Sequence, residues 1–376
     1  MKACKYKLRL NRAFQANCET TLALCRELYN AGLQERRDAW AINRVSVNYA
    51  TQCAQLSDLR ALRPELNGVH SQVLQQTLRK LQRAFENFFR RVKAGGTPGY
   101  PRFKSPDRFD SFCYPQTGFR LAGDKLHLSK IGSCRVRLSR PIEGTIKTCT
   151  IKREADGWYV IFAVAENQCR YLPRTGASVG GDVGLENFAT LSTGEVIENP
   201  RHLHNAERRL KTAQRKVSRR PNKRSNRRRK AVALLQKQHQ KVRRQRQDFQ
   251  HQTALQLIRE FDTIAVEDLN IRGLVKNHRL AKSISDAAWH AFFSILTSKA
   301  VEAGRQVVKV SPQFTSQDCA KCGQRVRKTL AVREHRCIAC GFVAHRDHNA
   351  ALNIKRRGTP FGESGRPLSE PRIPPL

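Results

Sequence analysis

Acidic residues are scarce in this sequence. Its 376 residues include 31 Asp and Glu against 70 Lys and Arg, so the formal net charge is +39. Between Arg208 and Arg246 there are 18 Lys or Arg and no acidic residue. Such an excess argues against a cationic partner and favours a polyanion, with nucleic acid preferred to a membrane. Because each neutralised phosphate releases counterions, so large an excess also predicts an extended binding surface.

Long apolar runs are also missing. The longest, WYVIFAVA, extends only from Trp158 to Ala165, whereas a bilayer-spanning helix needs roughly 20 apolar residues. The opening MKACKYKLRLNRAFQ lacks the apolar core of an export signal. We therefore expect a cytoplasmic, nucleoid-associated protein with no membrane partner.

The cysteines fall into two groups. Eight are scattered singly, which in a reducing compartment predicts buried or partly buried thiols. The other four form the pattern C-x2-C-x14-C-x2-C: Cys319, Cys322, Cys337 and Cys340. Two Cys-x-x-Cys-Gly knuckles can complete one tetrahedral site, so we expect one structural Zn²⁺, although the central gap is slightly short. A redox dithiol is the alternative, but it would need only one knuckle.

The first half of the chain predicts a sheet interrupted by helices. KYKLRL alternates basic and apolar residues, as a strand does, and residues 15–93 have helical periodicity. Short alternating segments follow between Phe119 and Ala165, with a turn at Asp156 and Gly157. We expect an antiparallel sheet or barrel that includes the N-terminal strand, with the helical block inserted.

The second half predicts a mixed α/β domain. SVGGDVG reads as a strand, residues 186–199 as a hairpin, and the basic stretch as helices around a loop at 218–230. DTIAVEDL and RQVVKVSP read as strands on either side of a helix, and a further helix at Ala350–Ile354 follows the cysteines. Residues 358–376, rich in Pro and Gly, predict a disordered tail.

Three separate carboxylates form a second candidate site. Asp182 ends a strand, Glu267 ends another, and Asp347 opens the last helix. Singly, they could be a turn residue, a surface acid beside Asp268, and a helix N-cap. Together, their order along strands and helices is that of an RNase H-like nuclease core. Carboxylate oxygens suit two Mg²⁺ ions some 4 Å apart, which can activate a water and stabilise a leaving oxygen.

Several basic and polar residues are candidates for nucleic-acid contact. Arg79 and Arg83 lie on the basic face of a predicted helix, which could equally be a solvated face. Arg102 and Lys104 alternate with aromatic residues after the helix, a composition suited to stacking on bases, although packing alone could explain it. Arg227, Arg228 and Arg229 lie in the long basic run.

Several motifs resemble one known family. GGDVGLENFATLSTGE, AVEDLNIRGL, KVSPQFTSQDCAKCG and HRDHNAALNI are similar to the successive signatures of TnpB (OrfB). These are transposon-encoded RNA-guided DNA endonucleases related to type V CRISPR effectors. LCRELYNAGLQERRDAW, SQVLQQTLRKLQRAFENFFRRVK and GYPRFKSPDRFDSF are similar to the N-terminal half of the family. Only the tail lies outside the resemblance.

The resemblance implies a domain plan. A wedge-type antiparallel β-barrel would comprise residues 1–12 and 97–175, with a helical recognition insert at 13–96. A RuvC-like (RNase H-like) nuclease domain would comprise residues 176–318 and 341–357, interrupted by a zinc-binding module at 319–340 and followed by the tail at 358–376.

It also implies a function. The partners would be a guide RNA and double-stranded target DNA, and cleavage would be metal-dependent hydrolysis at a single site. Asp182, Glu267 and Asp347 fall on the catalytic acid positions of the family, and by local alignment Tyr49 and Gln75 are candidates for reading a short target-adjacent DNA motif. Two residues depart from the family pattern: Gly181 stands where an apolar residue is usual, and His345 where an acid is frequent.

Other functions remain open from the sequence. The chain could be an RNA-guided DNA-binding repressor or transposition regulator without cleavage. A zinc-ribbon RNA-binding protein would explain the charge and the cysteines but not the carboxylates, and a DNA-joining transposase would share the RNase H-like fold. The oligomeric state is also open, a monomer being the simplest expectation.

Overall fold

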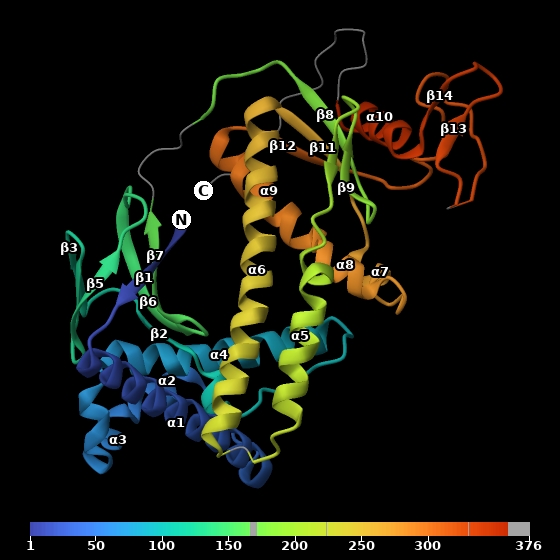
Figure 1. The fold of residues 1–376 in the computed structure, drawn as a ribbon. Helices are drawn as coiled ribbons and strands as arrows, with labels where there is room; N and C mark the ends of the chain where they lie inside the picture. Colours follow the sequence, from blue (N-terminus) through green and yellow to red (C-terminus); the bar gives the residue numbers. More distant parts are fainter. Residues whose placement is uncertain (166–170, 223, 330, 360–376) are drawn as a thin grey trace. The chain divides into compact units, whose positions relative to one another are not determined.

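The chain forms two compact units, residues 1–168 and 169–376 (Figure 1). The computed structural model describes residues 1–165, 171–222, 224–329 and 331–359. The predicted disordered tail therefore lies almost entirely outside the described residues. No helix in the described ranges is both long enough and apolar enough to cross a membrane.

The first unit contains a seven-stranded antiparallel sheet in the order β2-β6-β7-β1-β5-β4-β3. The N-terminal strand β1 pairs with β7 on one side and β5 on the other, which confirms that it joins the later strands. Its alternation is visible in burial, since Cys4, Tyr6 and Leu8 are buried between exposed lysines. The strand bounds are β1 Lys2–Arg9, β2 Ser111–Tyr114, β3 Phe119–Ala122, β4 Lys125–Leu128, β5 Gly132–Arg137, β6 Thr145–Glu154 and β7 Gly157–Ala165.

Four helices are inserted between β1 and β2, as the periodicity predicts. In α4, Leu74, Leu78, Leu81 and Phe85 recur at helical spacing and are all buried. They share one hydrophobic core with the sheet. The helix bounds are α1 Arg12–Asn43, α2 Tyr49–Ala54, α3 Leu56–Leu62 and α4 Ser71–Lys93, with short 3-10 helices at Pro64–Gly68 and Pro106–Arg108.

The expectation of a closed barrel is wrong for the described residues. The edge strands β2 and β3 do not pair with each other, so the sheet is open. The physical reason is that its apolar face is covered by helices instead of by the sheet itself. Phe14, Cys18 and Tyr29 of α1 pack in the same core as Phe112 and Tyr114 of β2.

The second unit contains a five-stranded mixed sheet in the order β10-β9-β8-β11-β12. Strands β8, β9 and β10 are antiparallel neighbours, whereas β11 runs parallel to both β8 and β12. The order of strands and helices along the chain is the one that the sequence predicts. The strand bounds are β8 Ser178–Val183, β9 Asn187–Leu191, β10 Val196–Glu198, β11 Thr263–Glu267 and β12 Gln306–Val310.

Helices cover both faces of this sheet (Figure 1). Val179, Ile264 and Val266 pack on one face with apolar residues of α6 and α9. Ala265 and Val310 point to the other face, where Ile354 of α10 packs. The helix bounds are α5 His202–Ser218, α6 Asn226–Glu260, α7 Ile271–Leu274, α8 Ala281–Ala287, α9 Trp289–Ala303 and α10 Arg346–Gly358. The basic segment 226–230, expected to be loop, belongs to α6.

The cysteine module lies between β12 and α10. It contains a two-stranded antiparallel sheet formed by β13 (Glu334–Arg336) and β14 (Val343–His345). The seven described single cysteines are buried or half-buried and make no disulfide, as expected: Cys4, Cys18, Cys25, Cys53, Cys113, Cys134 and Cys149. Cys169, the eighth, lies outside the described residues.

Candidate active site and zinc site

Asp182 and Glu267 lie side by side on neighbouring parallel strands. The last paired residues of β8 and β11 are Gly181 and Val266, and the two acids follow them directly. Neighbouring strands lie about 4.8 Å apart, and residues in register point to the same face. The strand pairing thus brings together two acids that are 85 positions apart in the sequence (267 minus 182).

The face onto which they point is the one covered by α10. A Cβ atom at Gly180 would lie 2.2 Å from the Ala351 carbonyl oxygen and 2.4 Å from the Lys355 nitrogen, so only glycine permits this approach. At the C-terminal end of the helix, a Cβ at Gly358 would lie 2.3 Å from Cβ of Ala265. Since side chains alternate along a strand, Asp182 shares the face of Gly180.

Asp347 is carried to the same region by α10. It precedes Ala351 by four residues, about 6 Å along a helix. Asp182 follows Gly180 by two residues, about 7 Å along a strand. Because Ala351 contacts Gly180, the two acids lie at similar distances from that contact. Asp347 is not the N-cap that its sequence position suggests. His345 is the capping residue, and its Nδ1 accepts a hydrogen bond from the Asp347 N–H at 3.3 Å. The Asp347 side chain is therefore not used by the cap.

The three acids interact electrostatically. Burial raises the pKa of Asp182 well above its usual value, and the charges of Glu267 and Asp347 raise it further. Arg346 opposes this effect. Each ionised carboxylate in such a cluster disfavours ionisation of the others. A bound divalent cation relieves this repulsion, because its positive charge favours the ionised forms.

Glu267 is the most enclosed of the three. Only 8% of its surface is exposed, and burial raises the pKa of its carboxyl group. The Thr315 hydroxyl donates a hydrogen bond of 2.6 Å to Glu267 Oε1, and this bond and the charge of Arg357 both act to lower the pKa.

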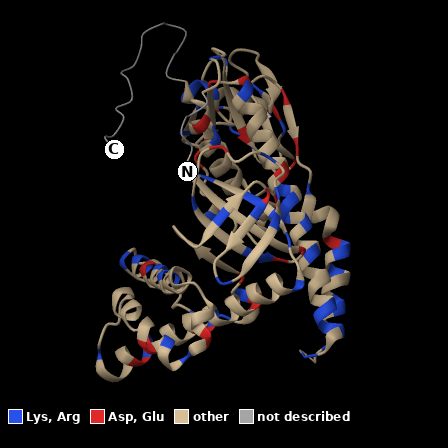
Figure 2. Ribbon diagram, turned by 90° about the vertical axis from the view of Figure 1, so that its left-hand side faces the viewer, with Lys and Arg blue, Asp and Glu red and all other residues tan. Residues whose placement is uncertain are grey.

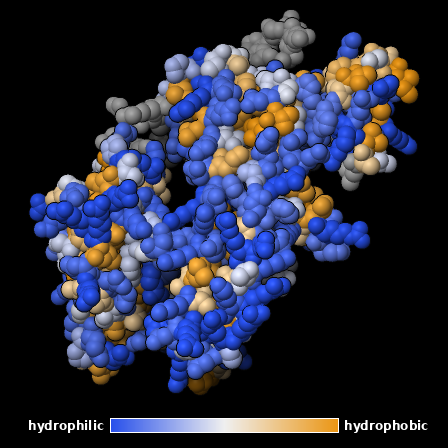
Figure 3. Space-filling view, in the orientation of Figure 1, coloured by the Kyte–Doolittle hydropathy of each residue, from blue (hydrophilic) through white to orange (hydrophobic). Residues whose placement is uncertain are grey.

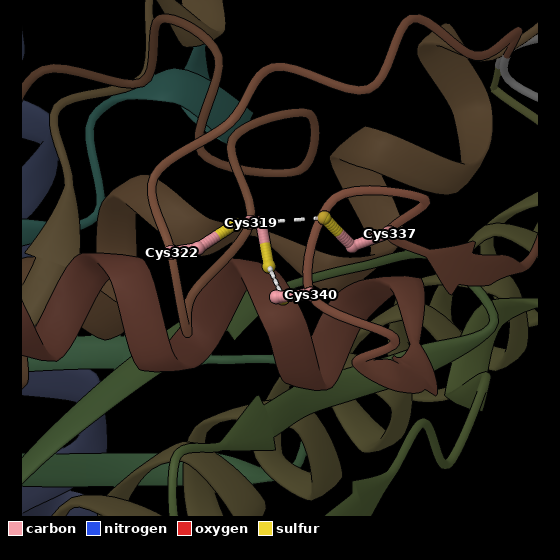
Figure 4. A group of neighbouring side chains, drawn as sticks. All are labelled: Cys319, Cys322, Cys337 and Cys340. Carbon is pink, nitrogen blue, oxygen red and sulfur yellow. Dashed lines mark hydrogen bonds between the residues drawn. The ribbon is translucent and has the colours of Figure 1, made fainter.

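The four cysteines of the two knuckles converge (Figure 4). Their sulfur atoms all lie within 4.8 Å of one another, with 3.6 Å between Cys319 and Cys340 and 3.5 Å between Cys322 and Cys337. Four sulfurs at Zn–S distances of about 2.3 Å would be about 3.8 Å apart, so the cluster is suited to zinc. In the part of the chain that the structure describes, these cysteines are the one group of His, Cys, Asp or Glu identified as close enough to hold a metal ion.

Four of the predicted nucleic-acid residues of the first unit lie together on α2 and α4. Gln75, Arg79 and Arg83 are exposed at successive four-residue steps along α4. Tyr49, at the start of α2, packs its ring against the Arg79 guanidinium at 4.1 Å. The structure therefore brings four of these residues together.

Arg102 and Lys104 follow α4 in a loop. Arg102 is exposed and Lys104 half-buried. The backbone of Lys104 is held by Asn30, whose side chain accepts from its N–H at 2.8 Å and donates to its carbonyl at 3.1 Å.

The basic hairpin, which we define as α5 and α6, carries most of the long basic run (Figure 2). Most of the face seen in Figure 3 is hydrophilic, with apolar residues in separate patches. Arg227 and Arg229 are exposed near the start of α6. Arg228 differs, because it donates to the carbonyl oxygens of Val217 and Arg220 at the end of α5. Its guanidinium links the two helices, and its contact with nucleic acid stays a prediction.

Sequence reasoning missed the polar side chains around Glu267 and α10. Thr315, Asn349 and Asn353 are all buried and hydrogen-bonded. The signal available was the four-residue spacing of the two asparagines in HNAALNI, which places both on one face of a helix.

Comparisons with known proteins agree with these features. Residues 161–278 match the family described as OrfB_IS605, a probable transposase, and residues 289–354 match the Cas12f1-like TNB domain. These two matches indicate an OrfB-type segment followed by a Cas12f1-like segment that bears the four cysteines.

Individual relatives extend the match over the whole chain. An RNA-guided DNA endonuclease of Streptomyces pristinaespiralis is 36% identical over 98% of this chain and 93% of its own. The RNA-guided DNA endonuclease InsQ of Escherichia coli K12 is 29% identical over 98% and 97%, respectively. The chain therefore belongs to the OrfB (TnpB-like) family of RNA-guided DNA endonucleases. A Cas12f1–sgRNA–target DNA complex, 17% identical, covers 94% of this chain and 99% of its own at a TM-score of 0.35.

Proposed function

We propose that this protein is an RNA-guided DNA endonuclease that hydrolyses target DNA at one RuvC-like, metal-dependent site. The observation that carries the proposal is the convergence of Asp182, Glu267 and Asp347 on one face of the second sheet, within a chain that belongs to the TnpB-like family. The partners would be a guide RNA and double-stranded DNA, and reading of a target-adjacent motif would fall to the face formed by Tyr49, Gln75, Arg79 and Arg83.

The three carboxylates would hold Mg²⁺. When bound, Mg²⁺ supplies a Lewis acid that lowers the pKa of a coordinated water and stabilises charge on phosphate oxygens. Two Mg²⁺ ions about 4 Å apart could share these carboxylates and stabilise both the attacking and the leaving oxygen of an in-line displacement. Asp182, with its raised pKa, must lose its proton before it can act as a ligand.

The four cysteines would hold one structural Zn²⁺. Four thiolates saturate a tetrahedral ion and leave no open position for substrate, so this site has no direct part in hydrolysis. The first knuckle contacts the helix that carries Asp347, because the N–H of Ala320 donates to Asn349 Oδ1.

Substitution of each acid tests the proposal. The full-length protein would be purified with the RNA that accompanies it from its own locus, the RNA sequenced, and cleavage assayed on targets with a randomised flank. Asp182→Ala, Glu267→Ala and Asp347→Ala should each reduce cleavage more than about 100-fold, which exceeds the 10–100-fold typical of losing an outer-shell partner. Guided DNA binding should persist.

Asp268→Ala is the matched control. Asp268 is adjacent to Glu267, but its side chain is 65% exposed and pairs with Lys309 at 3.3 Å. This variant should cleave as the wild type does. Normal cleavage by Asp182→Ala would refute the site assignment, and guided binding by a wild type that never cleaves would favour the repressor alternative.

A further inference from the structure

The segment between β12 and the first cysteine knuckle is hydrogen-bonded directly to Glu267. Thr315 is 4% exposed, and its hydroxyl is 2.6 Å from Glu267 Oε1 and 3.2 Å from the Pro312 carbonyl oxygen. A hydroxyl bonded to a buried carboxylate restricts how the carboxylate can rotate. With Oε1 held, the direction of the second oxygen is set as well.

The same segment is attached to α10 by Asn353. This side chain has no exposed surface, and its Nδ2 donates to the carbonyl oxygens of Thr315 at 2.9 Å and Asp318 at 2.6 Å. Asn353 therefore holds the backbone of the residue whose hydroxyl holds Glu267.

Asn349, one turn earlier in α10, extends the attachment into the cysteine knuckle. It too has no exposed surface, and its Nδ2 donates to the Asp318 carbonyl at 2.8 Å. Its Oδ1 accepts from the N–H of Ala320, at 2.9 Å. Ala320 lies between Cys319 and Cys322, so one side chain bridges the helix of Asp347 and the first knuckle.

Buried amides and hydroxyls cost free energy unless they are hydrogen-bonded, so apolar residues would fill this space more cheaply if packing alone were required. Here the hydrogen bonds form a continuous path from the knuckle to Glu267. Two ion pairs reinforce it, since Asp318 accepts from Arg325 at 2.9 Å and from Arg357 at 3.0 Å.

We propose that Thr315, Asn349 and Asn353 form a positioning bracket that orients Glu267 for its cation and makes the zinc-binding module a structural part of the active site. The inference rests on the proposed function, because it assigns Glu267 a divalent cation. Because the bracket contacts both Glu267 and the backbone of the first knuckle, loosening it should weaken cation binding at the acids and should let the knuckle open and release zinc more readily.

The test uses the full-length, zinc-loaded protein with two measurements that need no cleavage. Mn²⁺, a paramagnetic ion that also prefers carboxylates, is titrated and followed by electron paramagnetic resonance. Zinc release to a chelating dye is followed by absorbance. Thr315→Val should weaken Mn²⁺ binding about tenfold, the usual effect of losing a hydrogen bond to a charged group. Thr315→Ser, which keeps the hydroxyl, should restore binding to within about twofold.

Asn353→Leu tests the other half of the bracket, because leucine fills the same space without the amide. We expect zinc release to be about tenfold faster and Mn²⁺ binding to be weaker. Thr253→Val is the matched control: Thr253 is 5% exposed, lies on α6 in the same unit, and is not part of the bracket. It should change neither measurement, although all these variants can lower the melting temperature.

The possible outcomes separate the two proposals. Wild-type affinity for Mn²⁺ in Thr315→Val, or wild-type zinc release in Asn353→Leu, would overturn the bracket. An Asp182→Ala variant that binds Mn²⁺ as tightly as the wild type does would also overturn it. If Mn²⁺ binding depends on Asp182 and Thr315 as expected but guided DNA is never cut, the bracket stands and the endonuclease proposal fails.

Discussion

Asp182 combines burial with two neighbouring negative charges, and its environment is therefore unfavourable to the ionised form. A carboxyl group whose pKa is raised on folding binds its proton more tightly in the folded state than in the unfolded state. It follows that the metal-free protein loses stability as pH rises from the unfolded pKa towards the raised folded pKa.

Asp182→Asn should remove this loss. With zinc bound and without added Mg²⁺, the variant should unfold at a higher temperature than the wild type at pH 8, and the difference should shrink as pH falls towards 4. The gain in the free energy of unfolding is about 1.4 kcal/mol for each unit by which the pKa of Asp182 in the folded state exceeds its pKa in the unfolded state. Thermal unfolding followed by circular dichroism across this pH range measures it. Equal stability of the two proteins at pH 8 would contradict the raised pKa.

At the scale of elements, the packing of α10 against β8 decides where Asp347 lies. The approach depends on Gly180, because a side chain there would meet the helix backbone itself, which cannot rotate away as a flexible side chain can. Gly181, the next residue, departs from the usual apolar residue of the family but is not crowded. Its added Cβ would find its nearest neighbour at 3.6 Å, the side chain of Leu191.

This contrast predicts different effects of the same substitution at adjacent positions. Gly180→Ala should destabilise the second unit by about 1–3 kcal/mol or more through overpacking, and it should reduce cleavage because α10 is displaced. Gly181→Ala should fold and cleave normally, and it should be neutral or slightly stabilising because alanine costs less conformational entropy in a strand. Chemical denaturation and the cleavage assay compare the two. Equal stability of both variants would contradict the close packing of α10.

At the scale of the whole molecule, the charge is the dominant property. Its densest stretch is the basic hairpin, where Arg208, Arg215, Lys237 and Lys241 are exposed on α5 and α6. Lysines and arginines that pair with phosphates displace counterions, so they determine how steeply affinity falls with salt.

Neutralising these four residues to Gln should reduce the salt dependence of guide RNA binding. The slope of log affinity against log salt should become less steep by about 0.7 for each phosphate of single-stranded RNA that is no longer neutralised, and by somewhat more for a duplex. Filter binding at several salt concentrations measures the slope. A variant with four exposed cations of β3 to β5 changed to Gln (Arg120, Lys125, Arg135 and Arg137) has the same net charge. The same slope in both variants would mean that net charge, and not the hairpin, determines the affinity.

The sequence by itself determined the features that depend on residue type and local spacing. The excess of Lys and Arg, the two cysteine knuckles, the alternating strands and the succession of family motifs are all visible without coordinates. The adjacency of Asp182 and Glu267 was also predictable, because acids that end two parallel strands meet at one edge of a sheet. Membership of the TnpB-like family, expected from those motifs, is confirmed by relatives that match almost the whole chain.

Only the tertiary structure decided how these parts pack against one another. It showed an open sheet covered by helices in place of a barrel, His345 in place of Asp347 as the cap of α10, and Arg228 holding two helices together. It also revealed the link from Thr315 to Glu267. The physical reason is that periodicity and spacing report which face of an element is apolar, whereas partners distant in sequence are selected by packing and by the hydrogen bonds that buried polar groups require.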